Sequence, residues 1–272
     1  MFKINNLTYK YEKDKLALSN INMDFDKGDI IGIIGSNGSG KSTLFMNMMG
    51  ILKPDLGTIL FKNDIIKYNK KYLYDLRKEV GIVFQDPEKQ IFYSMVYDDI
   101  AFALRNLGIK ESIIKERITK ALESVNGLHL IDRPVHFLSY GQKKRVAIAS
   151  VIAMENKMVL LDEPTAGLDP ISTRAIVDII NNLKKKGIKI VISSHDMNLI
   201  YEICDYIYVL NQGEIISEGR TDTVFNDEKK ILRAGLELPW LVKLHNNLDL
   251  PLFRTEEELY KFWSKSKVIV NP

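Results

Sequence analysis

Gly35-Ser36-Asn37-Gly38-Ser39-Gly40-Lys41-Ser42-Thr43 is the stretch that decides the fold, because it follows the pattern G-x-x-x-x-G-K-[ST] of the phosphate-binding loop called Walker A. Its glycines let backbone N–H groups close around a polyphosphate where side chains would collide. Lys41 is suited to reach the β- and γ-phosphates, and the Ser42 hydroxyl is suited to ligate Mg²⁺. Residues 29–34 predict a buried strand before the loop, and residues 43–49 predict an apolar helix after it. This context favours a phosphate-binding loop over a glycine-rich turn that binds nothing.

The composition narrows the class of protein. The chain has 272 residues and a net charge of +3, from 38 basic and 35 acidic residues, which is too balanced to favour a nucleic-acid partner. Cys204 is the one cysteine, which excludes an internal disulfide and favours a reducing compartment. No apolar run approaches the roughly 18 residues of a transmembrane helix, and the N-terminus lacks a secretory signal pattern. We therefore expect a cytoplasmic chain that meets a membrane only through a partner.

A second stretch fits the same chemistry. Residues 158–161 are all apolar and lead directly into Asp162 and Glu163, which is the Walker B pattern of a central parallel strand with acids at its tip. The first carboxylate is suited to hold Mg²⁺, and Glu163 to act on an attacking water. A strand that ends in two acids is common, so the pattern gains its weight from following Walker A in the same chain.

Four other positions remain open from the residues alone. Gln85 and His195 each follow a predicted strand, where α/β sheets place ligand contacts. Taken alone, Gln85 is a weak indication of a ligand site, and an isolated histidine such as His195 more often has a structural role. Ser139 suits the N-cap of a helix predicted over 143–154. Tyr11 is placed either to stack on a purine or to pack beneath the loop.

The motifs, taken in order, resemble the nucleotide-binding domain of ABC-type ATPases over roughly residues 1–220. The family's signature LSGGQ matches residues 138–142, and its D-loop matches Ala166–Asp169. The resemblance implies that Glu163 and His195 are catalytic and that Asp169 acts in the D-loop. The ATP-binding residues would be Tyr11, Gly35, Ser36, Asn37, Gly38, Ser39, Gly40, Lys41, Ser42, Thr43 and Gln85. The ligands of Mg²⁺ would be Ser42, Gln85 and Asp162. The signature residues that face ATP across a dimer would be Leu138, Ser139, Tyr140, Gly141 and Gln142.

One residue departs from the family pattern. Tyr140 stands where the signature has its first glycine. Ser139 and Gly141, which the family uses on the nucleotide, are kept. We therefore expect ATP binding to persist and the fit across a dimer to change.

A narrower resemblance lies in residues 85–102, which are similar to the glutamine-loop helix of energy-coupling factor (ECF) importers, and best to the CbiO-type ATPases of cobalt importers. Residues 221–272 resemble that group's C-terminal helical extension more loosely. The alternatives are an exporter ATPase and a non-transport ABC ATPase, such as a DNA-repair, chromosome or translation protein. Those non-transport classes need a long coiled coil or two cassettes, and neither is apparent in this sequence.

The expected fold class is therefore α/β: a P-loop ABC-type ATPase core with an antiparallel β subdomain, a helical subdomain over about 86–155 and a small C-terminal helical extension. Residues 1–220 would form the ATP-binding domain and 221–272 the extension. The last predicted helix ends before residue 264, and we expect residues 264–272 to form a frayed tail.

The implied partners are a second ABC ATPase chain, identical or different, an integral membrane coupling subunit and a substrate-binding membrane subunit. They would hold the chain at the cytoplasmic face of the cell membrane. We expect residues 89–102 to dock on a membrane subunit through exposed apolar side chains: Ile91, Phe92, Tyr93 and Met95. The transported nutrient, whether cobalt, nickel or a vitamin, would be selected elsewhere, because His129, His136 and His245 show no ligand spacing.

Overall fold

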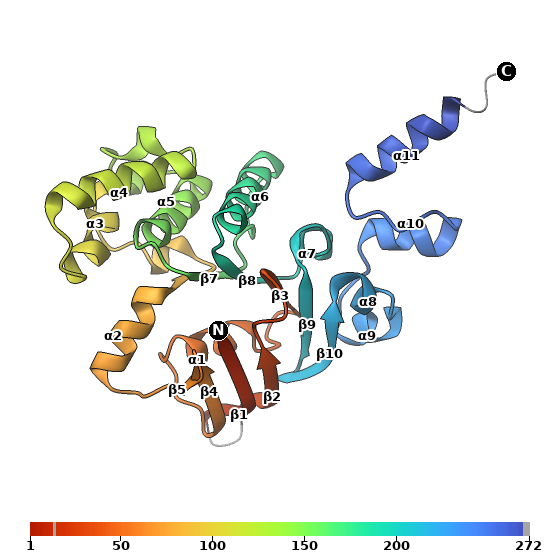
Figure 1. Ribbon diagram of the computed structural model, residues 1–272, viewed down its shortest axis with the longest axis horizontal. Helices are drawn as coiled ribbons and strands as arrows, with labels where there is room; N and C mark the ends of the chain where they lie inside the picture. The colour runs from red at the N-terminus through yellow and green to blue at the C-terminus, as the bar shows by residue number, and fades with distance from the viewer. Residues whose placement is uncertain (13–14, 269–272) are drawn as a thin grey trace.

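Two β-sheets of different kinds organise the chain (Figure 1). The computed structural model describes residues 1–12 and 15–268. The smaller sheet is antiparallel, with strand order β2-β1-β4-β5. Its strands are β1 (Phe2–Glu12), β2 (Lys15–Asp24), β4 (Leu56–Phe61) and β5 (Asp64–Ile65). Apolar residues of β2 alternate with polar ones, so one face of this sheet is buried and the other is wet.

The larger sheet carries the candidate site. Its order is β10-β9-β3-β8-β7-β6, parallel throughout except for the β9–β10 hairpin. The strands are β3 (Ile30–Ile34), β6 (Val80–Val83), β7 (Met158–Asp162), β8 (Lys189–Ser194), β9 (Tyr206–Asn211) and β10 (Glu214–Arg220). Successive residues of β3 pack into separate hydrophobic clusters on the two faces of the sheet. A strand covered on both faces needs apolar residues at every position, which explains the uninterrupted runs of the sequence.

Helices cover both faces of this sheet and extend beyond its edges. Near the sheet lie α1 (Lys41–Met48), α2 (Lys70–Glu79), α6 (Pro170–Lys185) and α7 (Met197–Ile203). Three further helices gather at one end of the molecule in Figure 1: α3 (Val96–Asn106), α4 (Glu111–Ser124) and α5 (Tyr140–Ala153). The short 3₁₀ turns are Pro87–Lys89, Leu128–Leu130 and Val135–Phe137.

Helix α5 begins three residues earlier than the predicted start at 143. Ser139 is its N-cap, as predicted, and accepts a hydrogen bond from the Gln142 backbone N–H, while the Gln142 side chain accepts one from the Ser139 N–H. This reciprocal capping box draws Tyr140 and Gly141 into the first turn. The residues of the sequence signature are therefore the N-terminal turn of a helix.

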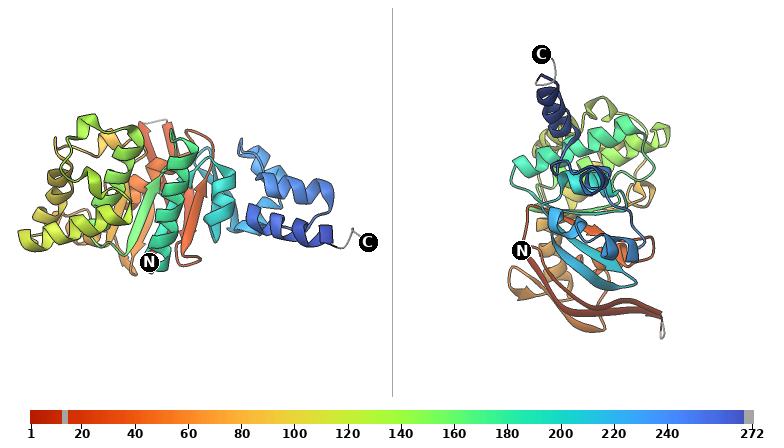
Figure 2. Two further views of the ribbon diagram at one scale, coloured as in Figure 1. Left: turned by 90° about the horizontal axis from the view of Figure 1, so that it is seen from above. Right: turned by 90° about the vertical axis from the view of Figure 1, so that its right-hand side faces the viewer.

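The C-terminal part forms a separate group of short helices at the other end (Figure 2). They are α8 (Thr221–Phe225), α9 (Glu228–Arg233), α10 (Trp240–Leu248) and α11 (Glu256–Val268). The prediction of a frayed tail from 264 is wrong as far as Val268, because α11 continues to that residue, and 269–272 lie outside the described residues. Within 1–12 and 15–268, no helix has the length and apolarity needed to cross a bilayer.

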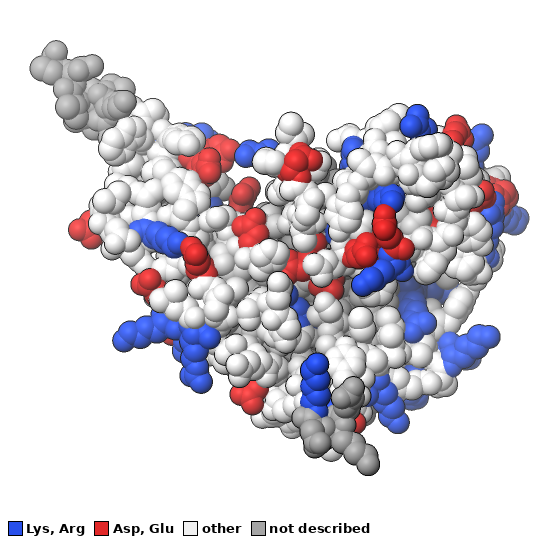
Figure 3. All heavy atoms as spheres, turned by 180° about the vertical axis from the view of Figure 1, so that it is seen from behind, with Lys and Arg blue, Asp and Glu red and all other residues white. Residues whose placement is uncertain are grey.

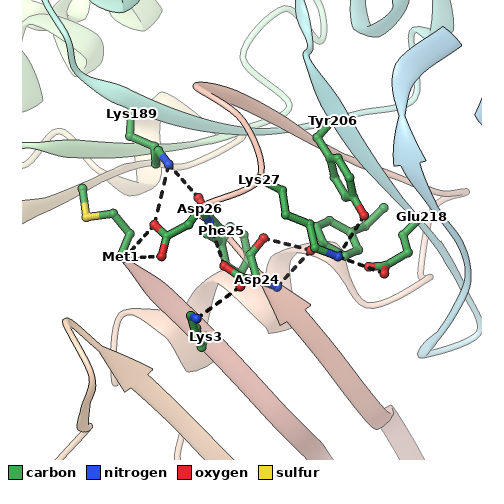
Figure 4. Close-up of polar contacts among 10 residues, drawn as sticks. Met1, Lys3, Asp24, Phe25, Asp26, Lys27, Lys189, Tyr206 and Glu218 are labelled. Carbon is green, nitrogen blue, oxygen red and sulfur yellow. Dashed lines mark hydrogen bonds and ion pairs between the residues drawn. The ribbon is translucent and has the colours of Figure 1, made fainter. Parts of the chain in front are cut away.

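A polar junction joins the two sheets at the base of the core (Figure 4). The Tyr208 hydroxyl donates to the Asp24 carbonyl oxygen at 2.9 Å and accepts from the Asp24 N–H at 2.9 Å. Lys27 donates to the Tyr206 hydroxyl at 2.9 Å and to Glu218 at 3.0 Å. Burial opposes the charge of Lys27, but these hydrogen bonds outweigh it and raise the pKa of its ammonium group. The predicted α/β architecture, a mostly parallel core sheet with an added antiparallel sheet and helical elements, is confirmed.

Candidate nucleotide site

The phosphate loop runs from the end of β3 into α1. A Cβ atom at Gly35 would lie 2.2 Å from the Leu210 carbonyl oxygen, so no larger residue fits there. Gly38 has φ of +80° and nothing within 4 Å of where a Cβ would lie. Gly40 caps the helix in the left-handed conformation, with φ of 111°. The loop therefore keeps its backbone open at the N-terminus of α1, where the helix dipole favours an anion.

Lys41 lies inside the curve of this loop. Its ammonium group donates to the carbonyl oxygens of Gly35 at 2.7 Å and Ser36 at 3.1 Å, and it lies 3.5 Å from Glu163 Oε1. The side chain is almost fully buried. A buried ammonium aimed at the loop is the group that a polyphosphate would recruit.

Asp162 and Glu163 end β7 beside the loop, as the sequence predicts. The Ser193 hydroxyl donates to Asp162 Oδ1 at 2.5 Å and accepts from the Glu163 backbone N–H at 3.0 Å, so it fixes both acids from the neighbouring strand. Glu163 has φ of 45°, an uncommon conformation for this residue that the surrounding bonds impose. Sequence reasoning missed Ser193, because its only signal is one polar residue at the end of an apolar strand.

His195 meets Glu163 directly. Its ring Nδ1 lies 2.8 Å from Glu163 Oε2, and its own side chain is 55% exposed. Glu163 is 4% exposed, and among the described residues its other oxygen, Oε1, accepts no hydrogen bond. One oxygen is therefore oriented by the histidine, while the other is buried, accepts no hydrogen bond within the described residues and lies 3.5 Å from the Lys41 ammonium nitrogen. That is the arrangement expected of a base that orients a water molecule.

The residues around the loop fit Mg-ATP. Ser39 Oγ, like Glu163 Oε1, is a buried oxygen without a hydrogen-bond partner in the described part of the chain. Hydroxyl, carboxylate and amide oxygens, as offered by Ser42, Asp162 and Gln85, are the ligands that Mg²⁺ prefers. No group of three or more His, Cys, Asp or Glu side chains that could hold a metal occurs within the described ranges. The phosphates and these other oxygens would therefore have to complete the coordination.

Gln85 follows β6 with an exposed side chain. Its backbone carbonyl oxygen accepts hydrogen bonds from the Tyr140 hydroxyl at 3.1 Å and from the Lys144 ammonium group. Lys144 is completely buried, and burial lowers the pKa of its ammonium group to about 8, although Asp162 and Asp86 act in the opposite direction. Sequence reasoning missed Lys144, because it stands among other polar residues, Gln142, Lys143 and Arg145, at the start of the helix and no local pattern marks it as buried.

The signature residues lie apart from the phosphate loop of the same chain. Leu138 is buried, and a Cβ at Gly141 would lie 3.2 Å from Ser172 Oγ, in the first turn of α6. Asp169 caps that helix by accepting from the Ser172 N–H at 2.9 Å and its hydroxyl at 2.7 Å. Among the described residues, no hydrogen bond or ion pair joins residues 138–142 to residues 35–43. The signature is thus held by its own D-loop region and not by its own nucleotide loop.

Tyr11 lies beside α1. Its hydroxyl is 3.1 Å from Thr43 Oγ1, and its ring meets Tyr9 edge-on with the ring centroids 5.1 Å apart. The side chain is 50% exposed, so part of the ring is open to solvent. Both purine stacking and a purely structural role remain compatible with this position.

The predicted docking segment is only partly exposed. Phe92 is 77% and Tyr93 42% exposed, whereas Ile91 packs partly against the core and Met95, the N-cap residue of α3, is half-buried. The prediction that all four are exposed is therefore wrong for Ile91 and Met95. Asp99 holds the segment by accepting from the backbone N–H groups of Phe92 at 2.8 Å and Tyr93 at 3.1 Å. The segment borders a cavity of about 380 Å³.

A further cavity of about 480 Å³ adjoins the phosphate loop and is lined by Ser36, Asn37, His195 and the segment before α10. A Cβ at Gly235 would lie 3.7 Å from the Ser36 Cβ, so this C-terminal segment forms a wall of the cavity. Charges of both signs are spread over the face in Figure 3, with acidic side chains gathered near the hollow between the two upper lobes. No large surface of a single sign appears on that face.

Comparison with known proteins bears on this site. The protein-family model described as ABC transporter matches residues 18–166. A putative ABC transporter ATP-binding protein of Listeria monocytogenes is 51% identical over 265 residues, covering 97% of this chain and 99% of the relative. The cobalt import ATP-binding protein CbiO of Salmonella typhimurium is 46% identical over 260 residues, covering 96% of each chain. An energy-coupling factor transporter ATP-binding protein of Clostridium perfringens is 44% identical over 240 residues, covering 88% of this chain and 84% of the relative.

Solved structures show similarity to the same group of proteins. The structure of cbiO1 from Clostridium perfringens, described as part of the ABC transporter complex cbiONQ, has a TM-score of 0.77 and 41% identity, covering 91% of this chain and 95% of that chain. A dimeric ATP-binding cassette bound to ADP and Pi has a TM-score of 0.73 and 26% identity, covering 81% and 99%. The similarity to solved structures therefore covers 81–91% of the chain and includes a dimeric cassette bound to ADP and Pi.

Proposed function

The chain belongs to the ATP-binding proteins of ABC transporters, and we propose that it is the ATP-hydrolysing subunit of an ECF-type importer, which energises uptake of cobalt or another small nutrient. The observation that carries the proposal is the junction of Lys41, Glu163 and His195 at the carboxyl ends of β3, β7 and β8. Open α/β sheets bind their ligands at this edge.

The roles of the residues follow from their positions. Lys41 and the backbone N–H groups of the phosphate loop bind the phosphates of ATP, and Ser42, Gln85 and Asp162 hold Mg²⁺. When bound, Mg²⁺ neutralises charge that develops on the phosphates. Glu163 orients the attacking water and accepts its proton, and His195 holds the carboxylate in place through the 2.8 Å contact.

Two copies of the ATP-binding fold are needed to complete a site. Phosphoryl transfer needs charge stabilisation around all the γ-oxygens, and one phosphate loop covers one side only. Since residues 138–142 lie apart from their own loop, we assign them to the ATP held by a partner chain, head to tail. The similar cassette, which is dimeric and bound to ADP and Pi, supports the pairing of two chains. Identical and different partner chains are both compatible with it.

The nutrient is proposed from the relatives. Cobalt import is the activity that the Salmonella relative's name gives, and the cbiO1 structure comes from a transporter complex. Selection of the nutrient would take place in a membrane subunit. An integral membrane coupling subunit would contact the segment around Phe92 and keep the chain at the cytoplasmic face of the cell membrane.

The test combines hydrolysis with the direction of transport. The purified chain should hydrolyse ATP in a Mg²⁺-dependent manner, and the folded Lys41→Ala variant should lose this activity, because Lys41 contributes charge to the phosphate site. Cells that carry Lys41→Ala should take up less radiolabelled Co²⁺ than the parent, and the tagged chain should copurify with an integral membrane protein. Increased nutrient accumulation in the variant would instead support an exporter, and the absence of a membrane partner would support a non-transport ATPase.

A further inference from the structure

Two side chains of α5 converge on a single backbone oxygen at the end of β6. The Tyr140 hydroxyl donates to the Gln85 carbonyl oxygen at 3.1 Å, and the Lys144 ammonium group donates to the same oxygen. Lys144 also lies 3.5 Å from the Phe84 carbonyl oxygen. Both donors are more than 50 residues away in sequence, so this is a tertiary link between two motifs.

The Tyr140 ring has a second contact. A Cβ at Gly167 would lie 3.4 Å from Tyr140 Cε1, and the Lys144 ammonium nitrogen lies 5.9 Å from the ring centroid. Gly167 belongs to the loop that follows Glu163. Tyr140 therefore bonds to Gln85 and lies beside the loop that follows Glu163, while it is itself part of the first turn of the signature helix.

This geometry constrains Gln85. A carbonyl oxygen held by two donors fixes the peptide plane that follows the Gln85 Cα, and with it the direction in which the side chain leaves the backbone. Because α5 is a rigid helix, a displacement of its N-terminal turn is transmitted to this carbonyl oxygen, and the reverse also holds. A glycine at position 140, as in LSGGQ, would have no side chain to make the link.

We propose that Tyr140 is a positioning residue that couples the two ATP sites of the dimer, by tying the signature turn that faces the partner's nucleotide to Gln85 of its own site. The inference rests on the proposed function, since it needs a dimer that hydrolyses ATP. It gives a role to the one residue that departs from the signature of the family. Binding of ATP at one site would orient the glutamine amide at the other.

The test removes a single oxygen atom. Tyr140→Phe keeps the ring and its contact with Gly167 and deletes the hydrogen bond to Gln85. Tyr74→Phe is a matched control: its hydroxyl also donates to a backbone carbonyl oxygen, that of Asn106 at 3.3 Å, and its exposure of 41% is close to the 38% of Tyr140. The rate of ATP hydrolysis by the chain is measured in two series. In one the ATP concentration varies at saturating Mg²⁺, and in the other the Mg²⁺ concentration varies at saturating ATP.

The parent should show a Hill coefficient for ATP above 1, and Tyr140→Phe a coefficient close to 1. The Mg²⁺ concentration for half-maximal hydrolysis should rise about 2- to 10-fold in Tyr140→Phe, the equivalent of one net hydrogen bond. The maximal rate should change less than this concentration does. Tyr74→Phe should match the parent in both profiles, and thermal unfolding of both variants shows whether either substitution acts through stability.

The outcomes separate this inference from the proposed function. Absence of Mg²⁺-dependent hydrolysis, both in the isolated parent chain and in the parent chain assembled with its partners, would overturn both. A parent that hydrolyses ATP without cooperativity, or a Tyr140→Phe variant whose ATP and Mg²⁺ profiles coincide with those of the parent, would overturn the coupling role alone. A variant that loses only maximal rate in proportion to lost stability would show a structural role and would also contradict the proposal.

Discussion

Replacement of Glu163 by glutamine is the sharpest perturbation that the site offers. The two carboxylate oxygens have different surroundings: Oε2 lies 2.8 Å from His195 Nδ1, and Oε1 lies 3.5 Å from the Lys41 ammonium nitrogen without a hydrogen bond. Glutamine has the same shape and keeps an oxygen for the histidine. It removes the negative charge and the capacity to accept a proton from water.

The expected magnitude follows from that difference. A positioned general base contributes about 10²–10⁴ in rate, so the rate of hydrolysis by Glu163→Gln should fall by that factor. Loss of a buried negative charge near the phosphates should leave ATP affinity unchanged or increase it. The fold should survive, because Lys41 keeps its hydrogen bonds to the Gly35 and Ser36 carbonyl oxygens. Bound, unhydrolysed ATP should then hold two chains together.

The assay pairs single-turnover hydrolysis with size-exclusion chromatography in Mg-ATP. Glu163→Gln should elute as a dimer, whereas the parent should elute as a monomer or form a dimer that dissociates quickly. Glu218→Gln is the matched control, since Glu218 is a glutamate paired with Lys27 in the junction between the sheets. The measurements should include the chain with its membrane partners, in case a different ATPase chain completes the dimer. Hydrolysis at the parent rate in both settings would remove Glu163 from the role of base.

Three further predictions concern separate parts of the chain. Phe92→Asp should weaken association with the membrane subunit at least about tenfold, because it charges a 77% exposed apolar anchor, while hydrolysis by the isolated chain stays within about twofold; copurification and uptake report it. Tyr11→Ala should weaken ATP binding by about 1–3 kcal/mol, the worth of stacking a base on an aromatic ring, measured by calorimetry. Asp205→Asn should lower the free energy of unfolding at pH 7 by about 1–3 kcal/mol, since Asp205 accepts from the Ile30 N–H at 2.9 Å and pairs with Lys184 at 2.9 Å. Burial raises the pKa of Asp205, but these contacts outweigh burial and lower the pKa below its ordinary value of 3.8. The contribution of Asp205 to the free energy of unfolding is therefore present above pH 3.8 and is lost as the pH falls through the pKa of the folded state. In urea titrations, the difference in stability between the parent and Asp205→Asn should shrink over that range.

Each of these has a control and a contrary outcome. Leu232→Asp charges a different exposed apolar side chain, that of a leucine on α9, and should assemble normally. Normal assembly of Phe92→Asp would instead place the docking surface elsewhere. Tyr260→Ala removes a 62% exposed tyrosine of α11 and is the control for Tyr11→Ala. If the two variants bind ATP with equal affinity, Tyr11 has only a structural role. Asp132→Asn changes an exposed carboxylate, and a pH-independent deficit in Asp205→Asn would show that charge is not the cause.

The fold was predictable because its local patterns agree with one another. The apolar runs at 30–34, 158–161 and 190–192 each lie in a strand buried on both faces, and Ser139 is the helix cap that its sequence context favours. The boundary of α5 was misplaced because Tyr140 and Gly141 are poor helix formers on propensity alone, and the side-chain capping box overrides that preference.

The candidate site was predictable residue by residue, but not as a network. Each motif is a short, local pattern of residues with a known chemical role, so Lys41 and Glu163 could be identified without coordinates. The contacts of Ser193 with Asp162 and of Lys144 with the Gln85 carbonyl oxygen join segments 31 and 59 residues apart, and no local pattern encodes them. Such contacts depend on strand order and helix packing, which only the tertiary structure supplies.

The contact between Lys41 and Glu163 connects stability with catalysis. Both side chains are at most 7% exposed, and a buried charge without a partner is strongly unfavourable, so each offsets the burial of the other while the site holds no phosphate. ATP must then compete with Glu163 for the ammonium group. In Glu163→Gln that competition disappears, and the nucleotide-free state has lost its ion pair. The same substitution therefore raises the free energy of the empty site and removes repulsion from the occupied one, and both changes shift the equilibrium toward bound ATP.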